Sequence, residues 1–172
     1  MGINDMEKVA SVAAAPYRGT SELDMLKDCK KWFDKDVIPH LFPGALRRIE
    51  RHKERGHEVV LVTGASPYLA GPLSRYLGIP GAFKATTLEV KEGIFTGNIE
   101  RVVYGREKVN ASKELAEEYG FDLSRSFAYG DSITDLPLLA KVEHPVAVNP
   151  DIRLNLHAKK MGWKRVKWTR MP

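Results

Sequence analysis

The hydrophobic and polar positions of this chain change period repeatedly from residue 43 onward, which predicts alternating helices and strands. Glu58–Val62 is short, almost wholly apolar and rich in β-branched residues, as expected for a strand buried on both faces of a parallel sheet. We expect helices over 44–55, 67–77, 107–119, 134–141 and 151–161, strands over 58–63, 84–86, 127–130 and 145–148, a hairpin around Glu92-Gly93, and a last strand near the C-terminus. This alternation is typical of an α/β fold in which ligands gather at the carboxyl ends of parallel strands.

The first 42 residues show no strand pattern. Residues 4–15 and 21–38 have helical spacing and are separated by Pro16–Gly19, a segment that favours a turn. We therefore predict two parts, a helical segment over residues 1–42 and an α/β domain over residues 43–172.

The strand predicted at 127–130 runs into two carboxylates four residues apart, Asp131 and Asp135. Mg²⁺ takes oxygen ligands, keeps several waters and usually bridges to a substrate phosphate, so acidic oxygens at a strand end indicate phosphoryl chemistry. An alternative is an ordinary strand-to-helix turn, in which Asp131 or Ser132 caps the helix and Asp135 favours its positive N-terminus.

Two further stretches carry candidate chemistry. Thr63 and Gly64 follow the strand predicted at 58–63 and offer a hydroxyl and backbone donors to a phosphate, unless Thr63 or Ser66 only caps the next helix. Lys108 stands at a helix start, where it opposes the helix dipole, so its position favours an ammonium aimed at a phosphate or at the carboxylates. The alternative for Lys108 is a solvated surface lysine.

The chain has, in this order, a strand that ends in a threonine, a lysine at a helix start, and a strand that ends in Gly-Asp-Ser-x-x-Asp. This order of motifs resembles the haloacid dehalogenase-like superfamily, and specifically its phosphoserine-phosphatase-like hydrolases. Thr63 matches the second motif of the family, Lys108 the third, and Asp131 with Asp135 the fourth. The resemblance covers roughly residues 33–168 and implies a Rossmann-like parallel sheet flanked by helices, with a helical cap. It implies a Mg²⁺-dependent phosphomonoesterase.

The resemblance also implies a role for each matched residue. Asp131 would hold Mg²⁺, while Asp135 would support the metal's waters or Lys108. Thr63 and the Gly64 amide would bind phosphate, and Lys108 would neutralise both the phosphate and the nucleophile of the family. The substrate would be a small phosphorylated metabolite or a lipid phosphate. Thr134 stands where phosphoserine phosphatases often have Asn, which counts against serine phosphate itself and leaves other small or lipid phosphates open.

One departure from the family concerns its nucleophile, the first Asp of an Asp-x-Asp-x-[Thr/Val] motif on the central strand, which forms an aspartyl-phosphate. In the family this strand precedes the cap, whereas this chain begins in what resembles the cap itself. We therefore expect an N-terminally shortened member, with residues 1–42 as a remnant cap and residues 43–172 as a core lacking its first strand. Such a chain would be inactive, and its unpaired strand edges would need a strand from a partner or an oligomer.

Asp34-Lys35-Asp36 does contain Asp-x-Asp, but its surroundings predict a helix. Leu23, Leu26 and Phe33 recur at helical spacing through this segment, and Ile38 stands where the family has Thr or Val. A charged helix face is the interpretation that we prefer to a catalytic pair. The alternative function is then a catalytically dead phosphate-binding or interaction module.

Composition is that of an ordinary globular chain, with 43% hydrophobic and 28% charged residues among 172. The net charge of +5 is concentrated near the C-terminus, where basic residues alternate with Trp163 and Trp168. A nucleic-acid surface is one interpretation, but an edge strand with protective lysines fits as well and is favoured here. No Gly-x-Gly-x-x-Gly follows a strand, which counts against a Rossmann-type nucleotide binder.

The remaining features bear on compartment. Cys29 is the single cysteine, which excludes an intramolecular disulfide and is compatible with a reducing, cytoplasmic compartment. No apolar run approaches the ~20 residues of a membrane span. The histidines are scattered without metal-ligand spacing.

Overall fold

The computed structural model describes residue 12 and residues 14–170, which form two compact units. Each unit combines two segments of the chain: one contains residues up to His40 together with Leu61–Tyr104, and the other contains Leu41–Val60 together with Gly105 onward. The predicted boundary after residue 42 stays a prediction. Most of the helix predicted over 4–15 lies outside the described residues, and the 3-10 helix η1 covers Ala15–Tyr17.

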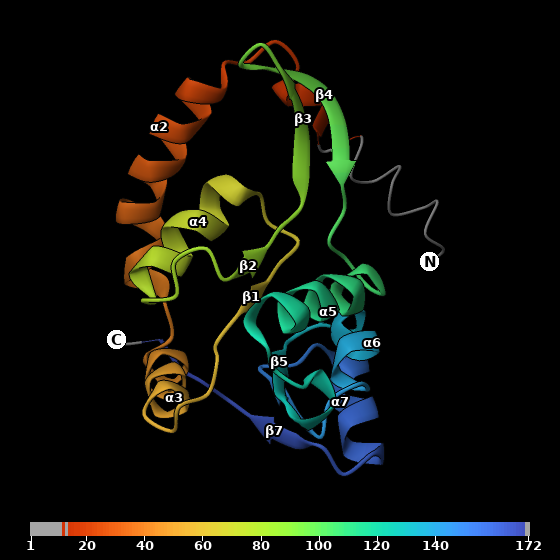
Figure 1. The fold of residues 1–172 in the computed structure, drawn as a ribbon. Helices are drawn as coiled ribbons and strands as arrows, with labels where there is room; N and C mark the ends of the chain where they lie inside the picture. Colours follow the sequence, from red (N-terminus) through yellow and green to blue (C-terminus); the bar gives the residue numbers. More distant parts are fainter. Residues whose placement is uncertain (1–11, 13, 171–172) are drawn as a thin grey trace. The chain divides into compact units, whose positions relative to one another are not determined.

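The first unit is built around two helices that pack together, α2 (Glu22–Trp32) and α4 (Pro67–Tyr76) (Figure 1). The predicted helix over 21–38 is confirmed, because α2 continues directly into a π-helical segment η2 (Phe33–Val37) and a 3-10 turn η3 (Ile38–His40). Phe33 is buried in this segment, and its ring contacts that of Tyr76 edge-on at 6.3 Å between centroids.

Two strands of the first unit differ from expectation. The strand predicted over 84–86 begins and ends earlier, at Phe83 and Lys84. The buried strand predicted over 58–63 is only β1 (Leu61–Val62), which is half-buried and pairs in parallel with β2 (Phe83–Lys84). Among the described strands β1 pairs with β2 alone, and this pairing does not extend to residues 58–60. The predicted hairpin is confirmed by β3 (Thr87–Lys91) and β4 (Ile94–Arg101). Glu92 and Gly93 both have positive φ, 51° and 76°, as a two-residue hairpin turn of type I′ requires.

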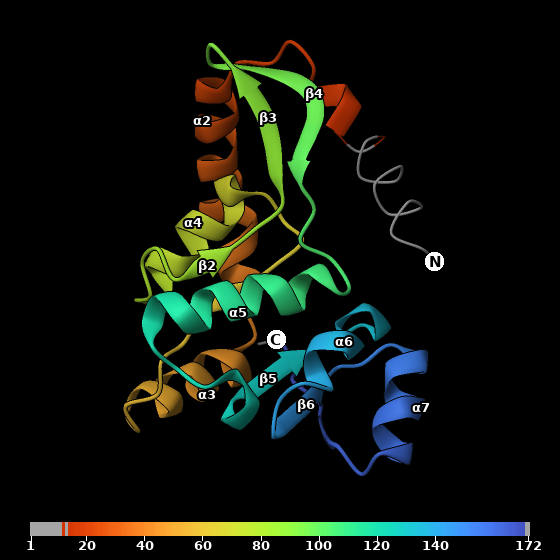
Figure 2. The same ribbon diagram turned by 45° about the vertical axis from the view of Figure 1, so that its right-hand side comes forward.

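The second unit is a three-stranded parallel sheet flanked by helices, as the alternating pattern predicted. The strands β5 (Phe127–Gly130), β6 (His144–Val148) and β7 (Lys164–Val166) lie in this order. Figure 2 shows α3 (Pro43–Lys53) on one side of the sheet and α6 (Leu136–Leu139) and α7 (Ile152–Lys160) on the other. The helix α5 (Glu107–Tyr119) packs on α6 and ends at Gly120, whose φ of 71° gives the left-handed cap. Fully buried Leu139, Ala147, Leu154 and Ala158 form the core between the sheet and α6 with α7.

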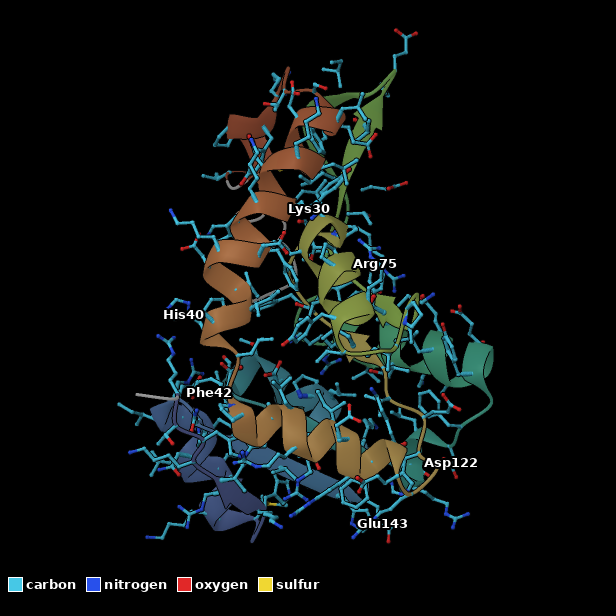
Figure 3. All side chains as sticks on the ribbon, turned by 90° about the vertical axis from the view of Figure 1, so that its left-hand side faces the viewer. Lys30, His40, Phe42, Arg75, Asp122 and Glu143 are labelled. Atoms are coloured by element: carbon cyan, nitrogen blue, oxygen red, sulfur yellow. The ribbon has the colours of Figure 1, made fainter. Side chains whose placement is uncertain are left out.

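The predicted C-terminal edge strand is confirmed by β7, and side chains hold the segment that follows it. Asn149 accepts a hydrogen bond from the backbone N–H of Trp168 at 2.9 Å and donates one to the carbonyl of Trp168 at 3.1 Å. The indole of Trp168 lies against Gly44, where a β-carbon would come within 2.5 Å of the ring. Arg170 then places its guanidinium 5.9 Å from the ring centre of Phe42. Phe42 lies at the start of α3 (Figure 3).

Across the described residues, no helix has the length and apolar character that crossing a membrane requires. In the second unit β5 pairs with β6 alone among the described strands. The expectation that such an edge takes a further strand stays a prediction.

Candidate active site

The candidate site of the second unit forms where β5 ends. Gly130 closes the strand, Asp131 follows it with an exposed side chain, and a 3-10 turn over Ile133–Asp135 (η5) leads into α6. Ser132 caps this turn by accepting a hydrogen bond from the N–H of Thr134, and Asp135 completes a capping box. The capping interpretation of this turn is therefore correct for Ser132, and it leaves the side chain of Asp131 at the strand end.

Lys108 and Asp135 form a buried ion pair beside this turn. The Nζ of Lys108 lies 2.6 Å from Oδ1 of Asp135, and the two side chains are only 16% and 8% exposed. The second oxygen of Asp135 accepts hydrogen bonds from the backbone N–H of Asp131, at 3.1 Å, and of Ser132, at 3.3 Å. One carboxylate thus orients both the lysine and the turn that carries Asp131. The structure does not show Lys108 as a solvated surface lysine.

Asp151 fixes the same turn from a distant part of the chain. One oxygen accepts from the N–H of Leu154 at 2.7 Å and caps α7, while the other accepts from the N–H of Ile133 at 2.8 Å. The N–H of Asp151 in turn donates to the carbonyl of Asp131 at 2.8 Å. The backbone hydrogen bonds from Leu154 and Ile133 lower the pKa of Asp151 below its ordinary value. Sequence reasoning did not assign this role to Asp151, although an Asp before a helix is a capping signal.

Thr63 and Gly64 lie in the first unit, where β1 passes into the loop before α4. The hydroxyl of Thr63 accepts a hydrogen bond from the N–H of Ala65 at 3.1 Å, and the N–H of Thr63 pairs with the carbonyl of Lys84 at 3.0 Å. Thr63 therefore shapes its own loop and does not cap α4. Ser66 holds the N-cap position of that helix, and Pro67 opens it. A β-carbon at Gly64 would lie 3.5 Å from the carbonyl oxygen of Val103, an ordinary contact.

Asp131 is the carboxylate of this site whose side chain is free to bind a metal ion. Within residues 14–170 and residue 12, no group of three or more His, Cys, Asp or Glu side chains is placed to hold a metal ion. Mg²⁺ needs only one or two carboxylates, because waters and substrate phosphate complete its coordination. Asp131 can supply such a carboxylate, since the oxygens of Asp135 already bind Lys108 and the turn.

A cluster of aromatic and histidine side chains covers the sheet near β5 and was missed by sequence reasoning. Nε2 of His52, on α3, lies 2.7 Å from the hydroxyl of Tyr129, and its Nδ1 lies 2.9 Å from Nδ1 of His57. Burial lowers the pKa of His52, and the neighbouring His57, Arg48 and Arg55 act in the same direction. Burial also raises the pKa of Tyr129. His52 and Tyr129 are 77 residues apart, so no local pattern could have joined them.

Asp34 and Asp36 lie in the helical segment η2 and not on a strand. Asp34 accepts an exposed hydrogen bond from Lys30, one turn earlier, at 3.1 Å. Burial raises the pKa of the Cys29 thiol nearby, which disfavours a reactive thiolate. The structure therefore supports the interpretation of this segment as a charged helix face.

Comparison with known families identifies the chain. The model of the haloacid dehalogenase-like hydrolases matches residues 1–140. The chain belongs to this family. Among curated relatives, the phosphoserine phosphatase SerB1 of Mycobacterium tuberculosis is 34% identical over 163 residues, which are 94% of this chain and 52% of SerB1. A probable phosphatase of the same organism is 40% identical over 134 residues, 78% of this chain and 46% of that protein.

Solved structures share the fold of this haloacid dehalogenase-like chain. A protein of unknown function from Bordetella pertussis superposes with a TM-score of 0.84 at 26% identity, covering 93% of this chain and 73% of that one. A phospho-aspartyl intermediate analogue of phosphoserine phosphatase superposes with a TM-score of 0.71 at 22% identity, covering 95% and 73%. The chain spans about half the length of the curated relatives described above. The predicted family and the α/β fold are thus confirmed.

Proposed function

We propose that this chain carries the metal- and phosphate-binding residues of a Mg²⁺-dependent phosphomonoesterase of the phosphoserine-phosphatase-like type. The observation that carries the proposal is the buried Lys108–Asp135 pair beside Asp131 at the end of β5. A buried ion pair is a weak source of stability, because the desolvation of both charges offsets much of their attraction. A chemical role explains its position better.

Each residue has a defined task in this proposal. Asp131 holds Mg²⁺, which neutralises negative charge on the transferred phosphoryl group when it is bound. Asp135 holds the ammonium of Lys108 in place, and Lys108 neutralises the phosphate. Thr63 and the N–H of Gly64 donate hydrogen bonds to phosphate oxygens. Family membership supports these assignments through the order of the motifs.

The proposed chemistry of the family requires an aspartate nucleophile. The one Asp-x-Asp in the sequence is Asp34–Asp36, and its first carboxylate binds Lys30 on an exposed helical face. We infer that these 172 residues bind metal and phosphate but do not turn over substrate, because positioning and charge stabilisation alone cannot form the covalent intermediate. The second candidate function, a phosphate-binding or interaction module, rests on the same observation.

The substrate class that we propose is a small phosphorylated metabolite or a lipid phosphate. A relative of this chain is named as a phosphoserine phosphatase, which supports a small phosphomonoester. In the turn after Asp131, the hydroxyl of Thr134 donates a hydrogen bond to the hydroxyl of Ser132 at 3.2 Å. The side chain of Thr134 therefore already has a partner within the turn.

The test measures both turnover and binding. Phosphate release from an aryl phosphate is followed with and without Mg²⁺, for the chain itself and for Asp131→Asn and Asp34→Asn. Binding of Mg²⁺ and of inorganic phosphate is measured by calorimetry on the same samples, with Asp122→Asn as a matched control, since Asp122 only caps a distant 3-10 turn. Binding that is lost in Asp131→Asn and kept in both other variants, without turnover, supports the proposal.

Other outcomes are equally clear. Mg²⁺-dependent turnover that Asp34→Asn abolishes would make Asp34 a nucleophile and would contradict the inferred lack of turnover. Binding that is equal in Asp131→Asn and Asp122→Asn would contradict the metal assignment. Phosphate binding without any effect of Mg²⁺ would favour the module over the enzyme.

A further inference from the structure

The outer face of α7 carries two large aliphatic side chains that nothing in its unit covers. Ile152 is 79% exposed and Leu156 is 62% exposed. They are four residues apart and so lie on one face of the helix, while Leu154 and Ala158 face the core and are fully buried. A helix with an inner core face and an outer aliphatic face has a second apolar surface to bury.

Basic residues border this aliphatic pair. Lys159 and Lys160 follow Leu156 by three and four residues and are both exposed, which places them next to it on the helix surface. Residues 152–172 contain seven Lys or Arg and no Asp or Glu, so this segment alone accounts for the excess of 27 basic over 22 acidic residues in the chain. β7, which packs beside α7, adds exposed Arg165, whose Nη1 donates a hydrogen bond to Oδ1 of Asn155 on α7 at 3.2 Å.

The helix α2 offers a contrast within the same protein. It also exposes leucines, Leu23 and Leu26, but its lysines are matched by acids: Lys27 pairs with Asp24 and Lys31 with Asp28. Throughout the described residues, no ion pair links a basic residue of the segment from Ile152 onward to a carboxylate. The basic side chains that follow Leu156 on α7 therefore have no ion-pair partner within the described residues, and the one carboxylate next to the aliphatic pair, Asp151, caps the start of the helix.

We propose that α7 and β7 form a docking surface for an anionic lipid membrane. Ile152 and Leu156 would enter the boundary between headgroups and acyl chains, and Lys159 and Lys160 would contact anionic headgroups. An exposed apolar face bordered by Lys and Arg is the feature that holds amphipathic helices at a membrane surface. The proposed association is peripheral: the surface would bind one face of the bilayer and would not cross it.

Two other occupants fit this surface less well. A second copy of the chain would bring two strongly positive faces together, and their repulsion opposes association. Single-stranded nucleic acid stacks its bases on free aromatic rings. The two indoles here are already packed, Trp163 against His157 and the core, and Trp168 against Gly44 while Asn149 holds its backbone.

The test is co-sedimentation of the full chain with vesicles. Binding to phosphatidylcholine vesicles is compared with binding to vesicles that also contain phosphatidylserine, at low and at high salt. The variants are Ile152→Ser/Leu156→Ser and Lys159→Gln/Lys160→Gln. The matched control is Leu23→Ser/Leu26→Ser, which removes similar exposed aliphatic area from the charge-balanced helix α2. Circular dichroism melts check that each variant folds.

We expect binding to the anionic vesicles only, weakened by salt because exposed charges are screened. The lysine variant should bind about fivefold more weakly for each charge removed. The aliphatic variant should bind roughly tenfold more weakly, and the α2 control should bind as the unchanged chain does. The proposal would be overturned by equal binding to both vesicle types, or by equal losses in the α7 and α2 variants.

Two further outcomes would also overturn it. If a single-stranded oligonucleotide binds as tightly as the anionic vesicles and the lysine variant loses both, the surface serves nucleic acid. If analytical ultracentrifugation shows a dimer that Ile152→Ser/Leu156→Ser dissociates, while no variant changes vesicle binding, the surface is an interface between two copies.

Discussion

Gly130 lies so close to Asp135 that a β-carbon at this glycine would come within 2.7 Å of both Cβ and Oδ2 of the aspartate. The strand end and the buried carboxylate therefore fit together only because residue 130 has no side chain. We predict that Gly130→Ala lowers the free energy of unfolding by about 1 to 3 kcal/mol, the usual effect of overpacking. Urea denaturation followed by circular dichroism measures this change.

Gly71→Ala is the control for Gly130→Ala, and its effect on the free energy of unfolding should be neutral or of the opposite sign. Gly71 lies inside α4, and a β-carbon there would be 3.7 Å from the side chain of Arg75, an ordinary contact. Ala is favoured over Gly in a helix by about 1 kcal/mol, so this variant should be as stable as the unchanged chain or more stable. Equal losses in both variants would show that the contact with Asp135 is not what matters.

Lys108→Met should be strongly destabilising, because it leaves the carboxylate of Asp135 buried without its cation. Removing one partner of a buried ion pair lowers the free energy of unfolding by about 3 to 5 kcal/mol. The double variant Lys108→Met/Asp135→Asn removes both charges and should lose less than the sum of the two single variants. Additive losses in this double-mutant cycle, measured by urea denaturation, would mean that the pair is not coupled.

Asp151 should make stability depend on pH in the acid range. Its pKa is lowered in the folded state, whereas the unfolded carboxyl titrates near its ordinary value of 3.8. The stabilisation is therefore complete above 3.8 and is lost as the pH falls through the folded pKa. Asp151→Ala should lower the free energy of unfolding at pH 7 by about 1 to 2 kcal/mol, the usual effect of losing an N-cap. The difference between the two proteins should shrink below pH 4 in urea titrations.

Asp151→Asn separates the charge from the cap. Asn is as good an N-cap as Asp, so α7 should keep its capping hydrogen bond. If Asp151→Asn behaves like the unchanged chain over the whole pH range, the carboxylate charge and its second hydrogen bond to Ile133 contribute nothing.

His52 should make the stability of the protein depend on pH near neutrality. Its folded pKa is lowered from an ordinary value of 6.5, so the unfolded chain binds the proton more readily. Stability is then fully present above pH 6.5 and is lost as the pH falls through the folded pKa. We predict that His52→Gln flattens the decrease in urea midpoint between pH 7 and pH 5. An unchanged decrease in His52→Gln would contradict this assignment.

The sequence predicted the second unit best, because its elements are bounded by local signals. The helix over 107–119 ends at Gly120, and the strand over 127–130 ends at Gly130, and the structure confirms both sets of bounds. The β1 strand was predicted too long, since an apolar run does not show whether a neighbouring strand is available to pair with it. Strand pairing is a long-range property that a local pattern does not contain.

The candidate site shows the same distinction. Asp131 and Asp135 were found because they are close in the sequence and follow a strand. Asp151 and His52 were missed because they reach the site region from 18 and 77 residues away, measured to Ile133 and Tyr129. The π-helical segment at Phe33–Val37 was likewise not predicted, because it has the same residue types as an ordinary helix.

The paired hydrogen bonds between Asn149 and Trp168 give this side chain the function of a peptide unit. Its amide offers one donor and one acceptor side by side, as a backbone group in a ladder does, and Trp168 pairs with it through both of its own backbone groups. These two hydrogen bonds hold the chain at Trp168, two residues beyond the end of β7 at Val166. Asp lacks the donor and Gln places the amide one methylene farther out, so the position of Trp168 depends on one asparagine.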